Sequence, residues 1–294
     1  MKERNEYMKI RDYCLPCLVN QVVKVAHMSH AQNKEELYHQ VFDYLSSLDF
    51  ELTNPEIIGQ TFQMLKKHIH NNDPYKEIRR YYNDLFLQQQ DYFRDLIEKA
   101  DDSFEMAIRY AIIGNIIDFS PMHNHDINDV MKYFKNIENQ RLTLNDIEKL
   151  KDDLKNAKTL LYLGDNCGEI CLDYLLIEKI KQMYPDLMIY FATRGEAVVN
   201  DSILEDAYYV HMDRYATIID NGDYSLGTIL HRVSPKFLDI YHQADVIIAK
   251  GQANYESLSE EVKNIYFLLM VKCHVIADDI GADEKSLVCF HREE

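Results

Sequence analysis

The chain is short of basic residues. Its 294 residues include 32 Lys and Arg but 49 Asp and Glu, which gives a formal net charge of −17 at pH 7. Proteins bind nucleic acids and anionic membranes mainly through an excess of Lys and Arg, so this balance argues against either as the main partner. An anionic substrate would need a local cationic pocket or a metal ion.

Long apolar runs are missing as well. No stretch reaches the about 18 consecutive apolar residues that indicate a membrane-spanning helix, and the start, Met-Lys-Glu-Arg-Asn-Glu, does not resemble a signal peptide. The six cysteines are unevenly spaced, unlike those of a secreted disulfide scaffold. We therefore expect a soluble cytoplasmic protein whose cysteines are free thiols or metal ligands. Its oligomeric state stays open.

The first half of the chain has helical patterns and almost no strand patterns. Thr53, two residues before Pro55, and Asp73, just before Pro74, each place a capping residue ahead of a proline in the first turn of a helix. We predict an all-helical domain over residues 1–155. Its helices are expected at 5–29, 34–48, 55–70, 74–99, 102–117, 126–136 and 143–156.

The second half alternates strand and helix patterns, which is typical of a parallel sheet covered on both faces. We predict a Rossmann-like, doubly wound α/β/α domain over residues 156–294, so the whole protein is of the α/β class. The carboxyl ends of such strands form the ligand-binding edge of the sheet. The strands are expected at 159–163, 187–192, 207–211, 244–249 and 265–271.

Asp165 and Asn166 lie at that edge, in the turn between the apolar run 160–163 and an apolar helical pattern at 170–183. The two side chains offer hard oxygen ligands to a divalent cation. The helix that follows would point its free N–H groups at the same space, where an anion can bind. Asp-Asn-x-Gly is also good turn and N-cap chemistry, so a purely structural cap is the alternative.

Later segments add polar side chains to the same edge. Arg194 follows the second predicted strand, and Asp201 lies in the connection after it. Because parallel strands of one sheet end at one edge, we expect both side chains to lie near Asp165. Asp201 would then be a third oxygen ligand of the cation.

Two lysines end apolar runs. Lys250 follows Val-Ile-Ile-Ala, and Lys272 follows Phe-Leu-Leu-Met-Val. We expect their ammonium groups to emerge at neighbouring strand ends, where they would meet substrate rather than core. The alternative is that each lysine pairs with a rim carboxylate such as Asp165 or Asp245.

Two other segments carry reactive or polar groups. Cys14 and Cys17 form a C-x-x-C pair, which can bind a soft metal, cycle as a dithiol or merely pack. A full zinc site needs further ligands, which Cys273 and Cys289 could supply in space. In Gly-Asn-Ile-Ile-Asp at 114–118, the Asn and the Asp lie on one face of an otherwise apolar helix end, although a helix C-cap is the plainer explanation.

Taken together, these motifs resemble those of the DUF89 (ARMT1-like) damage-control phosphatases. The C-x-x-C pair at 14–17 and Lys-Cys at 272–273 resemble the prokaryotic branch of that family. The resemblance covers nearly the whole chain, including the helical first half. The main matching segments are Gly-Asp-Asn-Cys-Gly-Glu at 164–169, Asn-Asp at 200–201, Lys-Gly-Gln-Ala-Asn-Tyr-Glu at 250–256 and Gly-Asn-Ile-Ile-Asp at 114–118.

The resemblance implies roles for individual residues. In the family an Asp-Asn pair and a later Asp hold a divalent cation, which corresponds here to Asp165, Asn166 and Asp201. These three are also the expected catalytic residues, with Mn, Co, Ni or Mg as cofactor. Cys167 stands where a small residue such as Ala is commoner, which would put a thiol near the metal. The expected substrate- and phosphate-binding residues are Glu169, Arg194, Lys250, Gly251, Asn254, Tyr255, Lys272, Asn115 and Asp118.

The expected function is metal-dependent hydrolysis of phosphate esters of small phosphometabolites, damaged ones included, such as sugar phosphates. A hard cation polarises a phosphoryl oxygen and lowers the pKa of its water, while Lys250, Lys272 and the helix N-terminus would neutralise developing charge. Either that water or the Asp165 carboxylate can be the nucleophile. The water is favoured, because a carboxylate that already binds the cation is a poorer attacker.

Two other classes of function stay open. A SAM-dependent methyltransferase also uses a glycine-bearing turn after its first strand, but Leu-Gly-Asp-Asn-Cys-Gly at 163–168 lacks the open glycine pattern. A non-enzymatic metal- or thiol-sensing module would centre on Cys14 and Cys17. The lack of Asp-x-Asp after a strand excludes a haloacid-type phosphatase. The sequence decides neither the phosphometabolite nor the metal.

Overall fold

The computed structural model describes residues 8–114, 134 and 140–292. Its helices are η1 (Asp12–Cys14), α1 (Leu15–Met28), α2 (Lys34–Ser46), α3 (Asn54–His68), α4 (Lys76–Leu87), α5 (Gln90–Lys99), α6 (Ser103–Ile113), α8 (Ile147–Asn156), α9 (Glu169–Met183), α10 (Leu204–Tyr209), η4 (Met212–Arg214), α11 (Pro235–Gln243), α12 (Gly251–Leu258) and α13 (His274–Ile280). Its strands are β1 (Leu142–Asn145), β2 (Thr159–Leu163), β3 (Met188–Thr193), β4 (Thr217–Asp220), β5 (Val246–Lys250), β6 (Ile265–Met270) and β7 (Leu287–His291). The predicted α/β class is confirmed.

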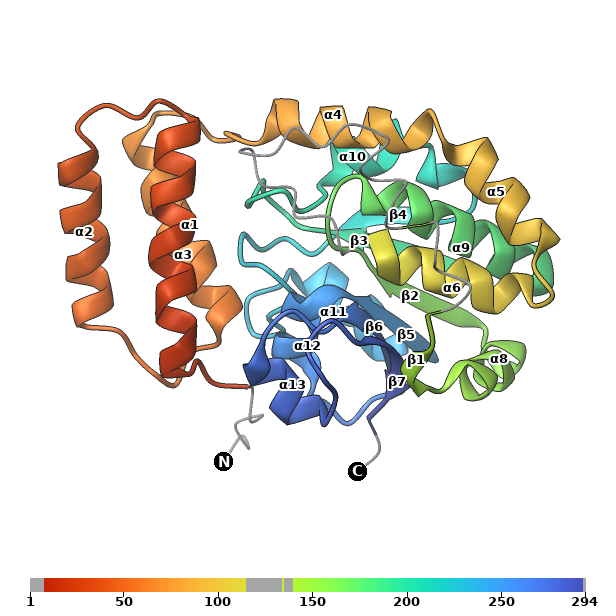
Figure 1. Cartoon of the computed structure of the whole chain (residues 1–294). Helices are drawn as coiled ribbons and strands as arrows, with labels where there is room; N and C mark the ends of the chain where they lie inside the picture. Colours follow the sequence, from red (N-terminus) through yellow and green to blue (C-terminus); the bar gives the residue numbers. More distant parts are fainter. Residues whose placement is uncertain (1–7, 115–133, 135–139, 293–294) are drawn as a thin grey trace.

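The strands form one sheet in the order β1-β7-β6-β5-β2-β3-β4 (Figure 1). Neighbours from β6 to β4 run parallel, whereas β7 pairs antiparallel with β6. From the central β2 the chain moves outward through β3 to β4 and then returns to β5 on the other side of β2. The strand order reverses between β2 and β5, and ligands bind at the carboxyl ends of strands beside such a switch point.

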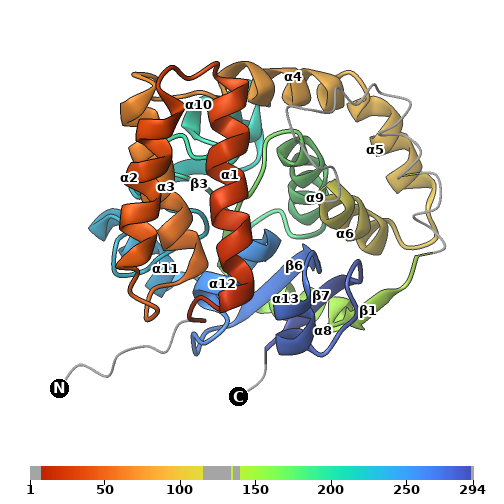
Figure 2. The same cartoon turned by 60° about the vertical axis from the view of Figure 1, so that its left-hand side comes forward.

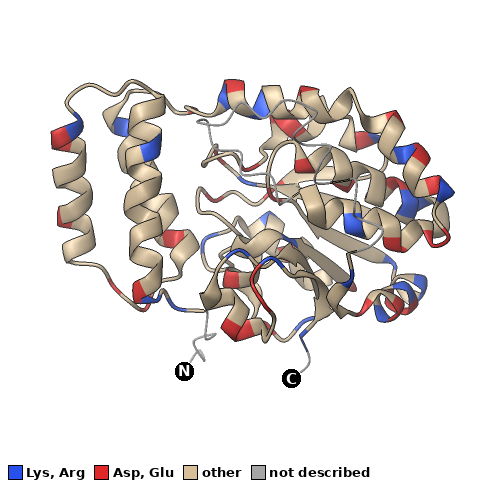
Figure 3. Ribbon diagram, viewed as in Figure 1, with Lys and Arg blue, Asp and Glu red and all other residues tan. Residues whose placement is uncertain are grey.

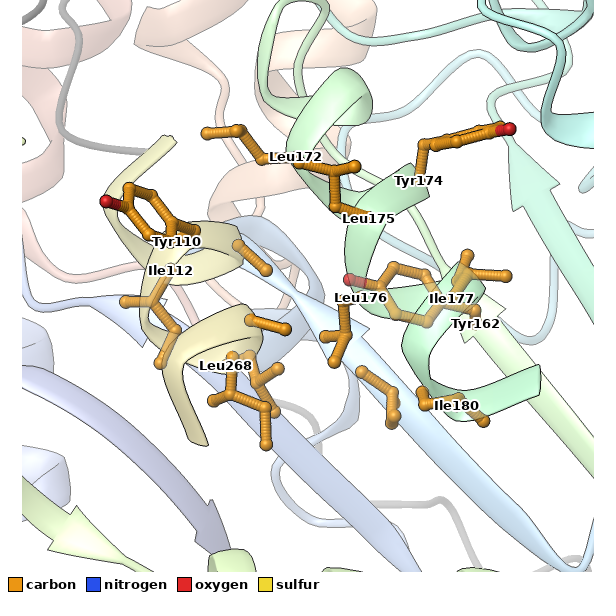
Figure 4. Packing of buried hydrophobic residues seen from close by; sticks show 14 of the residues in the cluster. Tyr110, Ile112, Tyr162, Leu172, Tyr174, Leu175, Leu176, Ile177, Ile180 and Leu268 are labelled. Atoms are coloured by element: carbon orange, nitrogen blue, oxygen red, sulfur yellow. The ribbon is translucent and has the colours of Figure 1, made fainter. Parts of the chain in front are cut away.

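Alternate residues of β2 enter two separate hydrophobic cores. Leu160 and Tyr162 pack with α4, α5, α6, α8 and α9, whereas Leu161 and Leu163 pack with α11, α12 and α13. Figure 4 shows the first of these cores, where Leu176 and Ile177 of α9 lie close to Tyr162 and side chains of α6 lie across from α9. A strand that is buried on both faces is apolar at every position, which explains the continuous run seen in the sequence.

Helices α1, α2 and α3 form a bundle beside the sheet (Figures 1 and 2). The start of α3 is capped as predicted: the Thr53 hydroxyl accepts from the Glu56 N–H, and the Glu56 carboxylate accepts from the Thr53 N–H. A Cβ on Gly59 would lie 2.8 Å from the Cα of Ser225. Helix α3 therefore packs directly against the loop after β4, at the carboxyl edge of the sheet.

The strand predicted at 207–211 is wrong, because this part of the chain belongs to α10 and the next strand is β4. Ala207 and Val210 are both buried, and a spacing of three residues suits a helix. The Asp206 carboxylate accepts from the Ile203 N–H at 3.1 Å, which stabilises the start of the helix. The apolar residues in this segment therefore follow the period of a helix and not that of the predicted strand.

The sequence pattern also misses two short strands, β1 and β7. The predicted helix at 143–156 begins with β1, and the predicted helix at 74–99 is divided into α4 and α5. The predicted helix at 126–136, as well as Asn115 and Asp118, lie outside the described residues. Helices α4 to α6 share a core with the sheet, and the domain boundary after residue 155 stays a prediction.

The outer surface carries interspersed charges of both signs. Figure 3 shows acidic and basic positions mixed along α4, α5 and α8. Arg94 of α5, for example, contacts Asp91 on its own helix and Glu178 of α9. The pair with Asp91 is exposed and contributes little to stability, whereas the pair with Glu178 is partly buried. Within the described ranges, no helix is long and apolar enough to cross a membrane.

Candidate active site

The turn after β2 places Asp165 and Asn166 beside the switch point. Both side chains are buried, with Asp165 only 7% exposed. The backbone carbonyl of Asp165 accepts from the Ser202 N–H at 2.8 Å and from its hydroxyl at 3.0 Å, and Asn166 forms a backbone bridge with Asp201. These contacts fix the loop that carries Asp201 against the turn, so the structure brings the three expected ligand residues together.

The loop that carries Asp201 has an unusual backbone. Val199 has a φ of +47°, a left-handed conformation that is rare for a β-branched residue. The Asp201 N–H donates to the Val198 carbonyl at 3.1 Å, and the Val198 side chain is buried in the core of the α1–α3 bundle. Packing by the bundle therefore holds this loop in a strained conformation, as is common at functional sites.

Arg194 joins the two carboxylates. Its Nε donates to Asp201 Oδ2 at 2.6 Å, and its Nη2 donates to Asp165 Oδ1 at 3.3 Å. Its Nη1 donates to Asn254 Oδ1 at 3.3 Å. The guanidinium group is almost completely buried, so Arg194 fixes the two acids relative to each other instead of facing solvent.

The site holds an excess of buried negative charge. The pKa of Asp165 is raised to about 8, first by burial and then by the charges of Asp201 and Glu169. Arg194 and Lys272 act in the opposite direction. Burial likewise raises the pKa of Asp201. The nearby cations only partly offset the cost of ionising these acids, so an additional cation would stabilise their charged forms.

The turn after β5 closes the other side of the site. Helix α12 starts at Gly251, which has a φ of +76°. The Asn254 Nδ2 donates to the carbonyls of Gly164 at 3.2 Å and Lys250 at 2.7 Å, which ties the ends of β2 and β5 together. The Asn254 Oδ1 accepts from the Thr228 hydroxyl at 2.9 Å. Asn254 is therefore part of the frame of the site, with its amide already engaged.

Lys250 does not emerge at the edge of the sheet, contrary to the prediction. Its side chain is 0% exposed, and its ammonium group binds Glu169, Asp173 and the carbonyl of Ala111. Burial alone would lower the pKa of Lys250, but the two carboxylates outweigh it and raise this pKa. Position 250 shares the face of β5 on which Ile248 meets the core containing α9. Lys250 is thus a buried structural cation and not a phosphate clamp.

Glu169 connects the buried ammonium group of Lys250 to the site. Its Oε2 accepts from Asn166 Nδ2 at 3.2 Å, and the same amide nitrogen donates to Asp165 Oδ2 at 2.8 Å. Because Glu169 is fully buried and also bound to Lys250, it acts on Asn166 and has no surface for direct contact with substrate. We therefore regard Glu169 as a positioning residue.

The start of α9 has fewer available N–H groups than expected. The Gly168 N–H donates to Asn83 Oδ1 at 2.7 Å, and the Cys167 N–H donates to the carbonyl of Asn200 at 3.0 Å. Burial and the nearby charge of Asp206 raise the pKa of the Cys167 thiol well above its usual range. These two N–H groups cannot serve an anion, and the Cys167 side chain lies beside α10.

The predictions for Tyr255 and Lys272 have different outcomes. The Tyr255 side chain is buried and its hydroxyl contacts Asp279 of α13, so it does not reach the site. Lys272 is exposed just after β6, and its charge acts to lower the pKa of both Asp165 and Asp201. Lys272 therefore stays a candidate for binding an anionic substrate, whereas Tyr255 belongs to the core on the opposite face.

Sequence reasoning missed four residues of this arrangement: Ser202, Asp173, Thr228 and Asn83. Asp173 could have been found, because it lies four residues after Glu169 in a helix that is otherwise largely apolar, and two acids on a buried helix face need a cationic partner. Asn83 and Thr228 act through side-chain bonds to distant loops. No local pattern in the sequence marks such bonds.

The residues around Asp165 fit a hard divalent cation. In the described part of the chain, no three His, Cys, Asp or Glu side chains form a group that could hold a metal ion. The predicted set is of another kind, because its third oxygen belongs to the amide of Asn166. That amide donates through Nδ2 to Asp165 and Glu169, and no described residue donates to its Oδ1. Two carboxylates and one amide oxygen are typical ligands of Mg²⁺ or Mn²⁺.

Known proteins match nearly the whole length of this chain. A family model described as the damage-control phosphatase ARMT1-like domain matches residues 10–288. An uncharacterized protein of Methanocaldococcus jannaschii is 35% identical over 96% of this chain and 95% of its own. A damage-control phosphatase of Pyrococcus horikoshii is 31% identical over 97% of this chain and 99% of its own. A damage-control phosphatase of Archaeoglobus fulgidus is 30% identical over 96% and 98%.

A solved structure agrees with these sequence matches. The crystal structure of a DUF89 family protein from Pyrococcus horikoshii matches with a TM-score of 0.86 and 29% identity. The match covers 98% of this chain and 100% of the other. The two folds therefore match over nearly the whole of both chains. The chain belongs to the DUF89 (ARMT1-like) family of damage-control phosphatases.

Proposed function

We propose that this protein is a metal-dependent phosphatase that hydrolyses phosphate monoesters of small phosphorylated metabolites, such as sugar phosphates. The observation that carries the proposal is the buried carboxylate pair, Asp165 and Asp201, held at the switch point with Arg194 between them. The relatives named damage-control phosphatases support the class of reaction.

Asp165, Asn166 and Asp201 would hold the cation, for which Mn, Co, Ni and Mg are the candidates. When bound, the cation polarises a phosphoryl oxygen and offsets the negative charge that develops during transfer. The crowding of carboxylates that raises the pKa of Asp165 supports this assignment, because a divalent charge would favour the ionised forms.

The other residues of the site position these ligands and meet the substrate. Arg194 keeps the two carboxylates in a fixed orientation, and Glu169 does the same for the Asn166 amide. The exposed ammonium group of Lys272 is suited to contact phosphate oxygens. The first N–H groups of α12 can also face an anion, because a helix start lacks intrahelical acceptors for them and α12 begins against Asp165.

The test is phosphatase activity after metal removal. The full chain is treated with EDTA, desalted, and assayed on p-nitrophenyl phosphate and a panel of sugar phosphates, with each of the four metals added back. We expect the stripped protein to be inactive and at least one metal to restore turnover. Asp165→Ala and Asp201→Ala should each lower kcat/KM by at least about a hundredfold.

The matched control is Asp152→Ala, which removes an exposed carboxylate from α8. This variant should keep wild-type kcat/KM, and circular dichroism should show that all three variants are folded. Undiminished activity in Asp165→Ala or Asp201→Ala would exclude these residues as ligands. Full activity in the presence of the chelator would contradict metal dependence itself.

A further inference from the structure

Three free thiols lie together away from the carboxylate site. Cys14 and Cys17 are at the start of α1, and Cys273 is the N-cap of α13. The rings of Tyr13 and His274 contact each other edge to face at 4.3 Å, which joins the two segments. The start of α1 lies beside α13 in Figures 1 and 2.

Helix geometry brings Cys14 and Cys17 close together. Cys14 is the N-cap of α1 and Cys17 is the third residue of its first turn. Cys14 is also the last residue of η1 and has a helical backbone conformation, with φ of −80° and ψ of −23°, so the two cysteines are three residues apart along a continuous helical stretch. Residues three apart on a helix have Cβ atoms about 5–6 Å apart, and a disulfide needs about 3.5–4.5 Å, so closure requires the backbone of the first turn to tighten by about 1–2 Å. The pair also differs in exposure, because Cys17 is exposed and Cys14 is half-buried.

A buried carboxylate is linked to the Cys273 thiol through the Gln252 side chain. Glu256 is 6% exposed. It accepts hydrogen bonds from the amides of Asn54 and Gln252, each at 3.3 Å, and no Lys, Arg or His in the described ranges forms an ion pair with it. The amide of Gln252 also donates to the Cys273 sulfur at 3.5 Å. After the effect of burial, Glu256 is the charged group that most raises the pKa of Cys14.

We propose that Cys14 and Cys17 form a reversible redox pair, with Glu256 as the proton acceptor that assists closure of the disulfide. The reaction partner is a low-molecular-weight disulfide. The proposal uses none of the residues around Asp165, so it stands or falls independently of the phosphatase assignment. The half-buried position of Cys14 and the exposure of Cys17 assign the order of the two steps.

The exposed Cys17 reacts first. Its thiolate attacks one sulfur of the small disulfide, which forms a mixed disulfide and releases one small thiolate. The Cys14 sulfur then attacks the Cys17 sulfur while its proton passes to the Glu256 carboxylate, and the second small thiolate leaves. Both small thiolates end as thiols after protonation. Overall, two protein thiols lose two electrons and two protons, and one small disulfide becomes two thiols.

A metal site built from the same groups is the competing possibility. In the conformation described here, the three sulfurs and the Glu256 carboxylate do not form a group that could hold a metal ion. Disulfide formation needs only two neighbouring sulfurs from one helical turn. The observed arrangement therefore favours redox chemistry over metal binding.

The experiment follows the full chain after reduction and removal of the reductant. The protein is incubated with oxidised and reduced glutathione in varied ratio, quenched with an alkylating agent, and examined by intact and tryptic mass spectrometry. Trypsin releases Cys14 and Cys17 in one peptide, residues 12–24, and Cys273 in another. We expect the peptide 12–24 to lose two hydrogens as the ratio becomes more oxidising, and to regain them when reduced glutathione is added back.

Four variants separate the roles of the groups. Cys14→Ser should stop at a glutathione adduct on Cys17, and Glu256→Gln should slow disulfide closure at least about tenfold, so that the same adduct accumulates. Cys273→Ser and the distant Cys289→Ser should both form the disulfide at the wild-type rate.

Three results would overturn the proposal. The first is a stable glutathione adduct on the wild-type chain, and the second is a disulfide that links Cys17 to Cys273. The third is thiols that react only after a chelator removes bound Zn²⁺, which would assign the cluster to a metal. The decisive measurements use the wild-type protein and do not depend on whether the variants fold.

Discussion

The Cα of Gly251 lies against the carboxylate of Asp165. A Cβ at this position would be only 1.9 Å from Asp165 Oδ2. Gly251 also has a φ of +76°, a conformation that residues with a side chain rarely adopt. The close approach joins the turn after β5 to the turn after β2, which are the two sides of the switch point.

Gly251→Ala should therefore damage the site more than the fold. The added methyl group must displace the Asp165 carboxylate, which would misplace a cation ligand. We expect kcat/KM to fall by at least about a hundredfold and the affinity for Mn²⁺ to fall as well. Steady-state kinetics and a Mn²⁺ titration followed by calorimetry measure both quantities.

Gly281→Ala is the matched control. Gly281 has a φ of +74°, and apart from its chain neighbours no heavy atom of the described residues lies within 4 Å of the position that its Cβ would occupy. Gly281→Ala therefore introduces the same backbone strain without a steric conflict. This variant should lose only about 1 kcal/mol of stability and keep its activity. If the two alanine variants lose activity equally, the contact with Asp165 is not the reason.

Arg194→Ala should be much less stable without metal than with it. In the metal-free protein, loss of Arg194 leaves Asp165 and Asp201 buried without their shared cation, and breaking a buried pair in this way costs about 3–5 kcal/mol. A bound divalent ion would take over part of this role. Urea unfolding in EDTA and in excess Mn²⁺ should show a larger stabilisation by the metal in Arg194→Ala than in the wild type.

Arg80→Ala is the control for this comparison, because Arg80 forms an exposed pair with Asp84 on α4. Exposed pairs contribute about 0–1 kcal/mol, so this variant should respond to Mn²⁺ as the wild type does. An equal effect of Mn²⁺ on the wild type and Arg194→Ala would mean that the arginine and the ion do not act on the same carboxylates.

The two lysines of the sequence motif should give opposite phenotypes. Lys250→Ala leaves Glu169 and Asp173 buried without a counter-charge and should cost about 3–5 kcal/mol of stability. Lys272→Ala should change stability by no more than about 0.5 kcal/mol and lower kcat/KM at least about tenfold. Thermal unfolding and kinetics on the best phosphate ester test both. A stable, inactive Lys250→Ala together with a fully active Lys272→Ala would reverse the assignment.

The different positions of these lysines show where sequence reasoning succeeds and where it stops. Apolar runs predicted the strands on both sides of the switch point, and the polar residues after them predicted that Asp165 and Asp201 would meet. The direction of the Lys250 side chain depends on strand parity and on acids in α9. Side chains alternate along a strand, so the sequence could have shown that Lys250 shares the face of Ile248. How deeply the ion pair is buried depends on packing between β5 and α9, which is not a local property.

The remaining errors have similar causes. The segment that forms α10 was assigned a strand period, although its helix is stabilised by Asp206, which binds Arg79 from α4. Tyr255 belongs to the motif at 250–256, which predicted contacts with substrate. The turn of α12 instead directs its side chain to Asp279 on the opposite face of the sheet. In both cases a contact between distant segments decides the outcome, and such contacts leave no periodic signal in the sequence.

Glu256 should make stability depend on pH. Burial raises the pKa of Glu256 from its usual value of 4.5 to about 7 in the folded protein. Between these two values the folded state therefore binds more protons than the unfolded state, so the free energy of unfolding decreases as pH rises through this window. The full difference between the two pKa values corresponds to a decrease of about 3 kcal/mol in the free energy of unfolding.

Glu256→Gln removes this titration and keeps an amide beside Asn54 and Gln252. We compare the free energy of unfolding of the wild type with that of the variant, with reductant present throughout. The wild-type value minus the variant value should fall by about 3 kcal/mol between pH 4.5 and pH 8. Urea unfolding at several pH values gives this difference, and groups that titrate equally in both proteins cancel. Glu284→Gln, at an exposed position, supplies the control curve. A difference that stays constant with pH, or that rises, would show that Glu256 is ionised at low cost and that its surroundings supply a cation to it.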